Sequence, residues 1–172
     1  MIVGLGDVVT SKEKRIDFDY DIDLSSIEIS GEYPFVDPVT VYGSVEDKNG
    51  AFALEATIEA TVTTACARCL REVKYDKIMD VSLILTRQID NEEMDDIIFV
   101  ETDNVELDDI LVPELLLDLD PVVLCKPDCK GLCVKCGHDL NEGECGCNRK
   151  EVDPRLAVLQ DLLKKRDKFS NQ

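Results

Sequence analysis

Strict alternation of apolar and polar residues is the feature that most limits what this chain can fold into. Residues 16–24 read Ile-Asp-Phe-Asp-Tyr-Asp-Ile-Asp-Leu, so every second side chain is apolar and each one between is aspartate. A period of two places the two sets on opposite faces of a β-strand. The segment therefore predicts a half-buried strand with a solvated acidic face. It does not predict a calcium loop, because the Gly and the terminal Glu of an EF-hand are missing.

Three further strands and a turn follow from the same pattern. Residues 39–45 form an apolar-rich run, and residues 52–62 and 72–86 are longer alternating segments. Asn49-Gly50 separates the first run from the second, and this dipeptide is a strong signal for a two-residue hairpin. We therefore predict an α+β fold, built mainly on an antiparallel β meander or a partly closed barrel. Residues 97–100 are a candidate for one more short strand.

Helices are expected only toward the C-terminus. Apolar residues at helical spacing are found at Leu107, Ile110, Leu111 and Leu115. They predict a short helix within residues 106–120, which Pro113 would either kink or open at its first turn. A C-terminal helix is predicted over residues 154–168, because Asp153 is a suitable N-cap and Pro154 suits the first helical position.

Charge is distributed unevenly along the 172 residues, whose net charge is −18. Residues 1–124 contribute −20 and residues 125–172 contribute +2, and residues 90–109 hold ten acids and no base. Nucleic-acid surfaces need Lys and Arg that displace counterions from phosphates, so the first part of the chain is poorly suited to that role. We expect an acidic β-rich domain over residues 1–120. A Cys-rich zinc-binding segment with the C-terminal helix would follow over residues 121–172, docked on the first domain.

The sequence also predicts the compartment. No run approaches the 18 apolar residues of a membrane-spanning helix. The first residues contain Gly and Asp where a signal peptide needs an apolar stretch, so we expect the chain in the cytoplasm. Disulfides are rare in that reducing compartment.

Eight cysteines occur as four close pairs. The pairs are Cys66 and Cys69, Cys125 and Cys129, Cys133 and Cys136, and Cys145 and Cys147. Paired thiolates on tight turns supply tetrahedral zinc with two ligands at a time, which favours metal binding over disulfides in a reducing compartment. Zinc is the favoured ion, and an iron–sulfur cluster is the alternative with the same ligands.

The spacing favours two four-cysteine sites. The compact set, within fifteen residues, is Cys133, Cys136, Cys145 and Cys147. The other set would bring the tip between two strands to the start of the Cys-rich segment, through Cys66, Cys69, Cys125 and Cys129. The alternative is a single zinc held within residues 125–147, with the first pair unused. His138, the only histidine, is expected in an exposed loop rather than as a ligand.

Catalysis is not expected. A catalytic zinc keeps an open position for water, whereas four thiolates saturate the ion. The chain contains no GxSxG, P-loop or GxGxxG motif, so we predict no catalytic residues, no small-molecule substrate and no enzyme activity.

Several motifs in order resemble the YceD family, the large ribosomal RNA subunit accumulation proteins. They are Cys66-Ala-Arg-Cys69-Leu70, the run from Cys125 to Gly137, Asp139-Leu-Asn141, Cys145-Gly-Cys147 and Asp153-Pro-Arg155. The resemblance implies a role in ribosome biogenesis through accumulation of 23S ribosomal RNA, and it implies no catalytic residue. Large-subunit ribosomal proteins, precursor ribosomal RNA or both are the expected partners.

Two other functions are considered. A zinc-dependent thiol redox sensor would release its metal on oxidation. A zinc-ribbon regulatory module that binds nucleic acid would need a basic surface, which a net charge of −18 argues against.

Overall fold

The computed structural model describes residues 1–87 and 96–147. The chain divides into two units, Met1–Pro127 and Asp128–Gln172, whose described residues are treated separately below. The predicted helix over residues 154–168 and part of the acidic block, residues 90–95, lie outside the described residues. The predicted domain boundary after residue 120 and the docking of the Cys-rich segment stay predictions.

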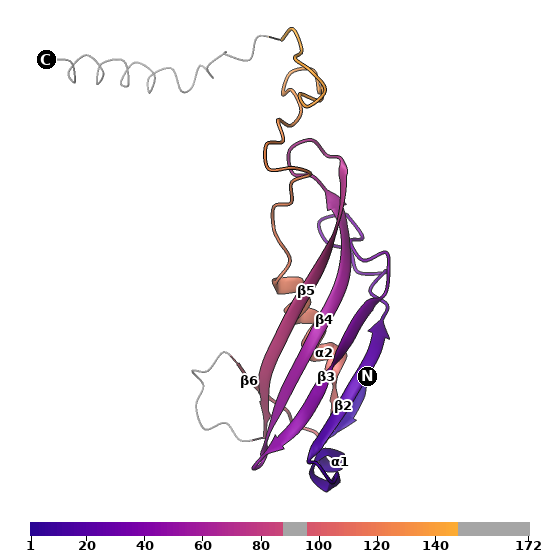
Figure 1. The fold of residues 1–172 in the computed structure, drawn as a ribbon, viewed down its shortest axis with the longest axis vertical. Coiled ribbons are helices and arrows are strands. Elements are labelled where there is room, and N and C mark those ends of the chain that lie inside the picture. The colour runs from indigo at the N-terminus through magenta and orange to yellow at the C-terminus, as the bar shows by residue number, and fades with distance from the viewer. Residues whose placement is uncertain (88–95, 148–172) are drawn as a thin grey trace, which may run out of the picture. The chain divides into compact units, whose positions relative to one another are not determined.

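The first unit is built on a five-stranded sheet with the order β2-β3-β4-β5-β6. Its strands, labelled in Figure 1, are β2 (Arg15–Ile22), β3 (Val39–Lys48), β4 (Ala51–Ala65), β5 (Glu72–Thr86) and β6 (Ile97–Phe99). The four long strands pair antiparallel in chain order, which confirms the predicted meander. Asn49 and Gly50 form the turn between β3 and β4, both with positive φ (60° and 98°), as a two-residue hairpin requires.

Two sequence expectations about this sheet need correction. The barrel alternative is wrong, because the order of the described strands begins at β2 and ends at β6, and the sheet is open. The sheet is also mixed rather than purely antiparallel, since β6 pairs with β5 in parallel, with Ile84 opposite Ile97. A run of three or four apolar residues carries no signal for strand direction, which explains why the sequence could not supply it.

A second, two-stranded sheet pairs β1 (Ile2–Gly4) with β7 (Asn104–Glu106). Each strand leads directly into a helix, β1 into α1 (Leu5–Thr10) and β7 into α2 (Leu107–Leu117). Helix α1 contradicts the expectation that helices lie only toward the C-terminus. Its sequence contains Gly and β-branched residues, which are poor helix formers, so tertiary contacts of the buried Leu5 and Val8 stabilise it instead of propensity.

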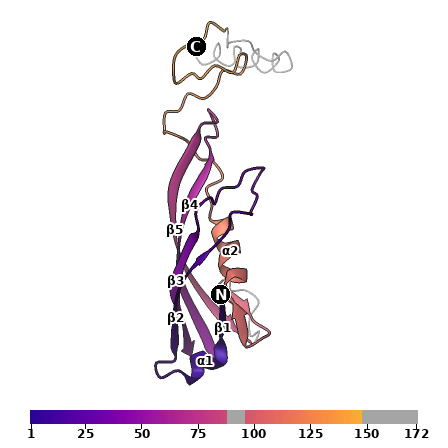
Figure 2. The same ribbon diagram turned by 90° about the vertical axis from the view of Figure 1, so that its right-hand side faces the viewer.

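Helix α2 lies within the predicted range, with Pro113 inside it rather than in its first turn. It lies on one side of the main sheet, as Figure 2 shows. Leu107, Leu111 and Leu115 are fully buried and join the apolar side chains of that sheet face in one core. Burying a leucine stabilises the folded state by about 1.5–3 kcal/mol, so this contact is a principal stabiliser of the unit.

Gly43 of β3 marks a place where two strands approach unusually closely. A Cβ atom built there would lie 2.1 Å from the Glu55 carbonyl oxygen of β4 and 2.7 Å from the Ala56 Cα. Such contacts are far inside van der Waals separation, so only glycine fits without moving the β4 backbone.

The other face of the sheet carries the alternating acids, and hydroxyl groups of neighbouring strands hold several of them. Thr40 donates to Asp21 at 2.8 Å, Thr57 to Asp80 at 2.7 Å, and Tyr42 to Glu59 at 2.8 Å. These cross-strand bonds keep the carboxylates apart on a solvated face, as the sequence predicts. No helix within residues 1–87 and 96–147 has the length and apolarity needed to cross a membrane.

The described part of the second unit, residues 128–147, has little apolar core. Its buried side chains are Cys129, Cys133 and Leu140. One isolated bridge, between Leu132 and Asp139, is its regular backbone pairing. Within residues 128–147, hydrophobic burial therefore contributes little to stability.

Candidate metal centres

The first CxxC pair lies in a tight turn between β4 and β5. The Leu70 N–H donates to the Cys66 carbonyl at 2.9 Å, and the Cys66 N–H donates to the Arg71 carbonyl at 2.8 Å. Leu70 closes the turn with φ at 59°, in the left-handed region that leucine rarely adopts. The turn places the sulfur atoms of Cys66 and Cys69 on the same side of a short loop, and both residues are buried.

The second CxxC pair repeats this turn in the second unit. The Gly137 N–H donates to the Cys133 carbonyl at 2.8 Å, and the Cys133 N–H donates to the His138 carbonyl at 2.8 Å. Gly137 has φ at 71°, the value that Leu70 nearly matches. Two segments of different sequence thus form the same cysteine knuckle, the turn that brings two sulfurs to one metal ion.

Backbone N–H groups point at the first sulfur of each knuckle. At Cys66 they belong to Cys125, Arg68 and Cys69, and hydrogen bonding lowers the pKa of this thiol to about 6. At Cys133 the donors Lys135 and Cys136 likewise lower the pKa to about 6. Both knuckles therefore favour the thiolate form, which is the form that binds metal.

The eight cysteines gather into two groups of four, and the sulfur atoms of each group lie within 4.8 Å of one another. One group is Cys66, Cys69, Cys125 and Cys129, and the other is Cys133, Cys136, Cys145 and Cys147. Each group could hold a metal ion. Within residues 1–87 and 96–147, no other set of three or more ligand-type side chains is arranged in this way.

The last residues of the first unit bring a third cysteine to the first knuckle. The Ala67 N–H donates to the Val123 carbonyl at 2.9 Å, which holds the chain before Cys125 against the turn. The sulfur atoms of Cys69 and Cys125 are 3.5 Å apart. Because 56 residues separate the two cysteines in the sequence, the fold of the unit, and not a single turn, brings them together.

Cys129 has a partner that residue spacing did not identify. The Asn141 side-chain amide donates to the Cys129 sulfur at 3.5 Å, and its carbonyl oxygen accepts from the Lys130 N–H at 2.9 Å. The Asp139 carboxylate orients the same amide, accepting from it at 2.7 Å. Groups that hold a ligand in this way tune a metal site and its affinity. Asn141 belongs to the motif Asp139-Leu-Asn141, to which the sequence alone assigns no structural role.

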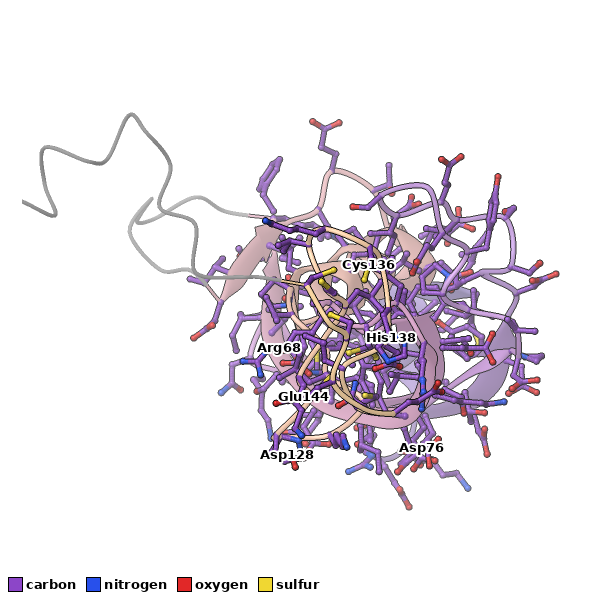
Figure 3. All side chains as sticks on the ribbon, turned by 90° about the horizontal axis from the view of Figure 1, so that it is seen from above. Arg68, Asp76, Asp128, Cys136, His138 and Glu144 are labelled. Carbon is purple, nitrogen blue, oxygen red and sulfur yellow. The ribbon has the colours of Figure 1, made fainter. Side chains whose placement is uncertain are left out.

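The second group is the more exposed one. Cys136 is exposed and Cys145 and Cys147 are half-buried. A hydrogen bond to the Cys136 sulfur, and then burial, raise the pKa of Cys147 to about 12. His138 is exposed and lies outside both groups. Figure 3 labels His138 and Cys136 and draws sulfur in yellow.

The donor set suits a soft divalent ion. Four thiolates at mutual distances below 4.8 Å would repel one another, and a dication removes that repulsion. The two groups contain the same cysteines as the two sites that the sequence favours. That these residues bind zinc stays a prediction.

Both knuckles, and most of the two strands that flank the first of them, lie in the segment that a known family shares. The family model described as "Large ribosomal RNA subunit accumulation protein YceD" matches residues 54–163. This chain belongs to the YceD family. The match covers most of strand β4, all of strand β5 and helix α2, and all eight cysteines.

The chain is also similar to several curated proteins. The uncharacterized protein YlbN of Bacillus subtilis (strain 168) is 28% identical over 158 residues, which cover 90% of this chain and 92% of that protein. The chloroplastic large ribosomal RNA subunit accumulation protein YCED homolog 1 of Arabidopsis thaliana is 26% identical over 76% of this chain and 50% of its own length. Its Zea mays counterpart is 27% identical over 94% of this chain and 66% of its own length. No solved structure matches the chain.

Proposed function

We propose that this chain is a non-catalytic, zinc-binding ribosome-biogenesis factor of the cytoplasm that supports accumulation of 23S ribosomal RNA. The observation that carries the proposal is the pair of four-cysteine groups, found in a member of a family described by that role. Two chloroplastic relatives carry the same description. Four thiolates leave no open position on zinc, so the sites would stabilise structure rather than activate water.

Zinc fits these groups better than the alternatives. Thiolates are soft ligands, and the N–H groups around Cys66 and Cys133 stabilise the charged sulfur. The zinc prediction is tested by elemental analysis of the purified chain, with two zinc ions per chain expected. A Cys66→Ser/Cys69→Ser variant should hold one. His138→Ala is the matched control and should keep both, because His138 is exposed and outside both groups.

The partner we propose is a basic large-subunit ribosomal protein that the factor holds before it joins precursor RNA. The acidic face of the sheet supports this, since the hydroxyls of Thr40, Thr57 and Tyr42 hold carboxylates in fixed positions there. Such a face steers a cationic partner and repels phosphate. Binding should therefore weaken steeply with salt, as the Debye length falls to about 8 Å at physiological ionic strength.

The role in RNA accumulation is tested in cells that lack this gene. The parent chain and His138→Ala should restore 23S ribosomal RNA relative to 16S, whereas Cys66→Ser/Cys69→Ser should not. A parent chain that leaves the 23S level unchanged would contradict the proposed function. Asp19→Asn/Asp80→Asn should restore it less well if the acidic face binds the partner, and equally well if that face is only solvated.

One observation favours a second candidate, a zinc-dependent thiol redox sensor. Cys136 is exposed and the neighbouring Cys145 and Cys147 are half-buried, so oxidant can reach the second group. Zinc release measured with a chromogenic chelator during peroxide titration distinguishes the two. A sensor releases zinc from the second group at low oxidant and recovers it on reduction, whereas a structural site resists oxidant.

A further inference from the structure

Leu70 adopts a backbone conformation that leucine normally avoids. Its φ is 59°, in the left-handed region, where a Cβ atom costs about 1–2 kcal/mol. The same position of the second knuckle is Gly137, for which this conformation is free of strain. The knuckle itself therefore has no need of a leucine at residue 70.

Packing within the molecule does not explain the leucine either. Its side chain is 68% exposed, so little of it contacts the described protein. Strain that the fold does not repay through burial points to a use outside the fold.

Leu70 is one of three exposed apolar residues that surround a single hollow. Tyr33 is 55% exposed and Val36 is 66% exposed, and together with Leu70 they line a depression of about 360 Å³. The remaining walls are Glu32, Thr63, Thr64, Ala65 and Glu72. The hollow thus combines apolar contact area with carboxylates, and its lining contains no lysine or arginine.

The loop that carries Tyr33 and Val36 is held in place. The Thr63 N–H of β4 donates to the Pro34 carbonyl at 2.8 Å. The Glu32 carboxylate accepts from the Thr64 hydroxyl at 2.8 Å and from the Ala65 N–H at 3.2 Å. A hollow fixed by such bonds exists before a partner arrives, which lowers the entropic cost of binding.

We propose that Leu70, Tyr33 and Val36 form a docking site for a basic polypeptide segment that presents an apolar side chain. Charge identifies the occupant: the hollow is lined by two acids, and the unit that contains it carries −19. An RNA segment would be repelled by this charge, whereas a cationic segment is attracted. The inference rests on the proposed function, because the large-subunit ribosomal proteins are the basic polypeptides that a YceD family member would meet.

The test compares two replacements of Leu70 with one control. Leu70→Gly removes the side chain and the strain together, and Leu70→Asn keeps a residue that tolerates the left-handed conformation. Val9→Ala is the control, since Val9 is 48% exposed but lies on α1, outside both the hollow and the acidic face of the sheet. Each zinc-loaded full chain is titrated with purified, RNA-free large-subunit ribosomal proteins and, separately, with protein-free large-subunit RNA.

Both Leu70 variants should bind the ribosomal proteins about tenfold more weakly, as expected for a central apolar contact. Val9→Ala should bind them as the parent does, and the melting temperatures of the Leu70 variants should not fall. Parent-like binding by Leu70→Gly, or a lower melting temperature in both Leu70 variants, would overturn the docking site. Binding of the RNA that depends on Leu70 would overturn it as well.

The same variants separate this inference from the proposed function. If the parent chain restores 23S ribosomal RNA in deficient cells and Leu70→Gly restores it equally, the docking site is wrong and the proposed function stands. If the parent chain restores nothing, the proposed function fails first, and the inference fails with it.

Discussion

Cys66 and Cys69 lie between two fifteen-residue strands of a sheet with its own core, whereas Cys133 and Cys136 lie in a segment whose described residues form no helix and no named strand. Their backbone hydrogen bonds are nevertheless the same. The comparison teaches that the knuckle is a local structure that needs no particular support. We infer that what differs is the source of stability, which is apolar burial around the first knuckle and the proposed metal ion around the second.

The largest effect is expected from removing the metal of the second group. In a Cys133→Ser/Cys136→Ser variant, residues 128–147 should lose their structure, because structural zinc contributes about 10–16 kcal/mol in small zinc modules. Amide hydrogen exchange should show full loss of protection there, with strands β4 and β5 still protected. Cys66→Ser/Cys69→Ser is the control, because it leaves all four cysteines of the second group in place. If residues 128–147 stay protected in Cys133→Ser/Cys136→Ser, the metal is not the source of their stability.

The next effect lies in the core of the first unit. Leu111 of α2 is fully buried, and Leu111→Ala should destabilise the sheet by about 2–5 kcal/mol through lost contacts and a cavity. Urea unfolding of the zinc-loaded chain measures this change. Leu117→Ala should cost less than about 0.5 kcal/mol, because Leu117 is 83% exposed. Zinc bound by the second group should be unaffected in both variants, and a loss there would contradict this prediction.

A smaller effect is expected at Asn141, which contacts the Cys129 sulfur and the Lys130 backbone. Asn141→Ala should lower zinc affinity at the first group by about 10–100-fold, the usual effect of losing a group that orients a ligand. Competition with a chromogenic chelator measures it. Asn141→Asp places a carboxylate against the Cys129 sulfur and the Asp139 carboxylate, so its affinity should fall at least as far as that of Asn141→Ala. Equal affinities in all three proteins would show that the amide has no role.

The smallest effect concerns the residue that closes each knuckle. Gly137→Leu adds a Cβ atom that meets no other group within 4 Å, so backbone strain of about 1–2 kcal/mol is the main expected cost. The measurement is the zinc affinity of the second group against the same chelator. An unchanged affinity would remove the argument that Leu70 is strained.

Much of this fold could be predicted from side-chain alternation. The meander from β2 to β5 follows from the period of two and from Asn49-Gly50, because a half-buried strand and a two-residue turn each have a direct local signal. The parallel direction of β6 and the helix α1 have none, since short segments take their structure from their neighbours.

The candidate site divides in a similar way. Cysteine spacing predicts the two groups, because only close pairs can offer two sulfurs from one turn. The hydrogen bond from Asn141 to the Cys129 sulfur and the left-handed backbone of Leu70 depend on the folded backbone, so no residue pattern encodes them.

The close approach at Gly43 has a consequence for how freely this sheet can vary. The acids on the outer face contact hydroxyls through bonds that several polar residues could replace, so a saturation scan should tolerate many substitutions there. Residue 43 offers no such freedom, because even alanine would place a carbon 2.1 Å from the Glu55 carbonyl. In such a scan Gly43, although it has no side chain, should tolerate as few substitutions as the most restrictive position of the core.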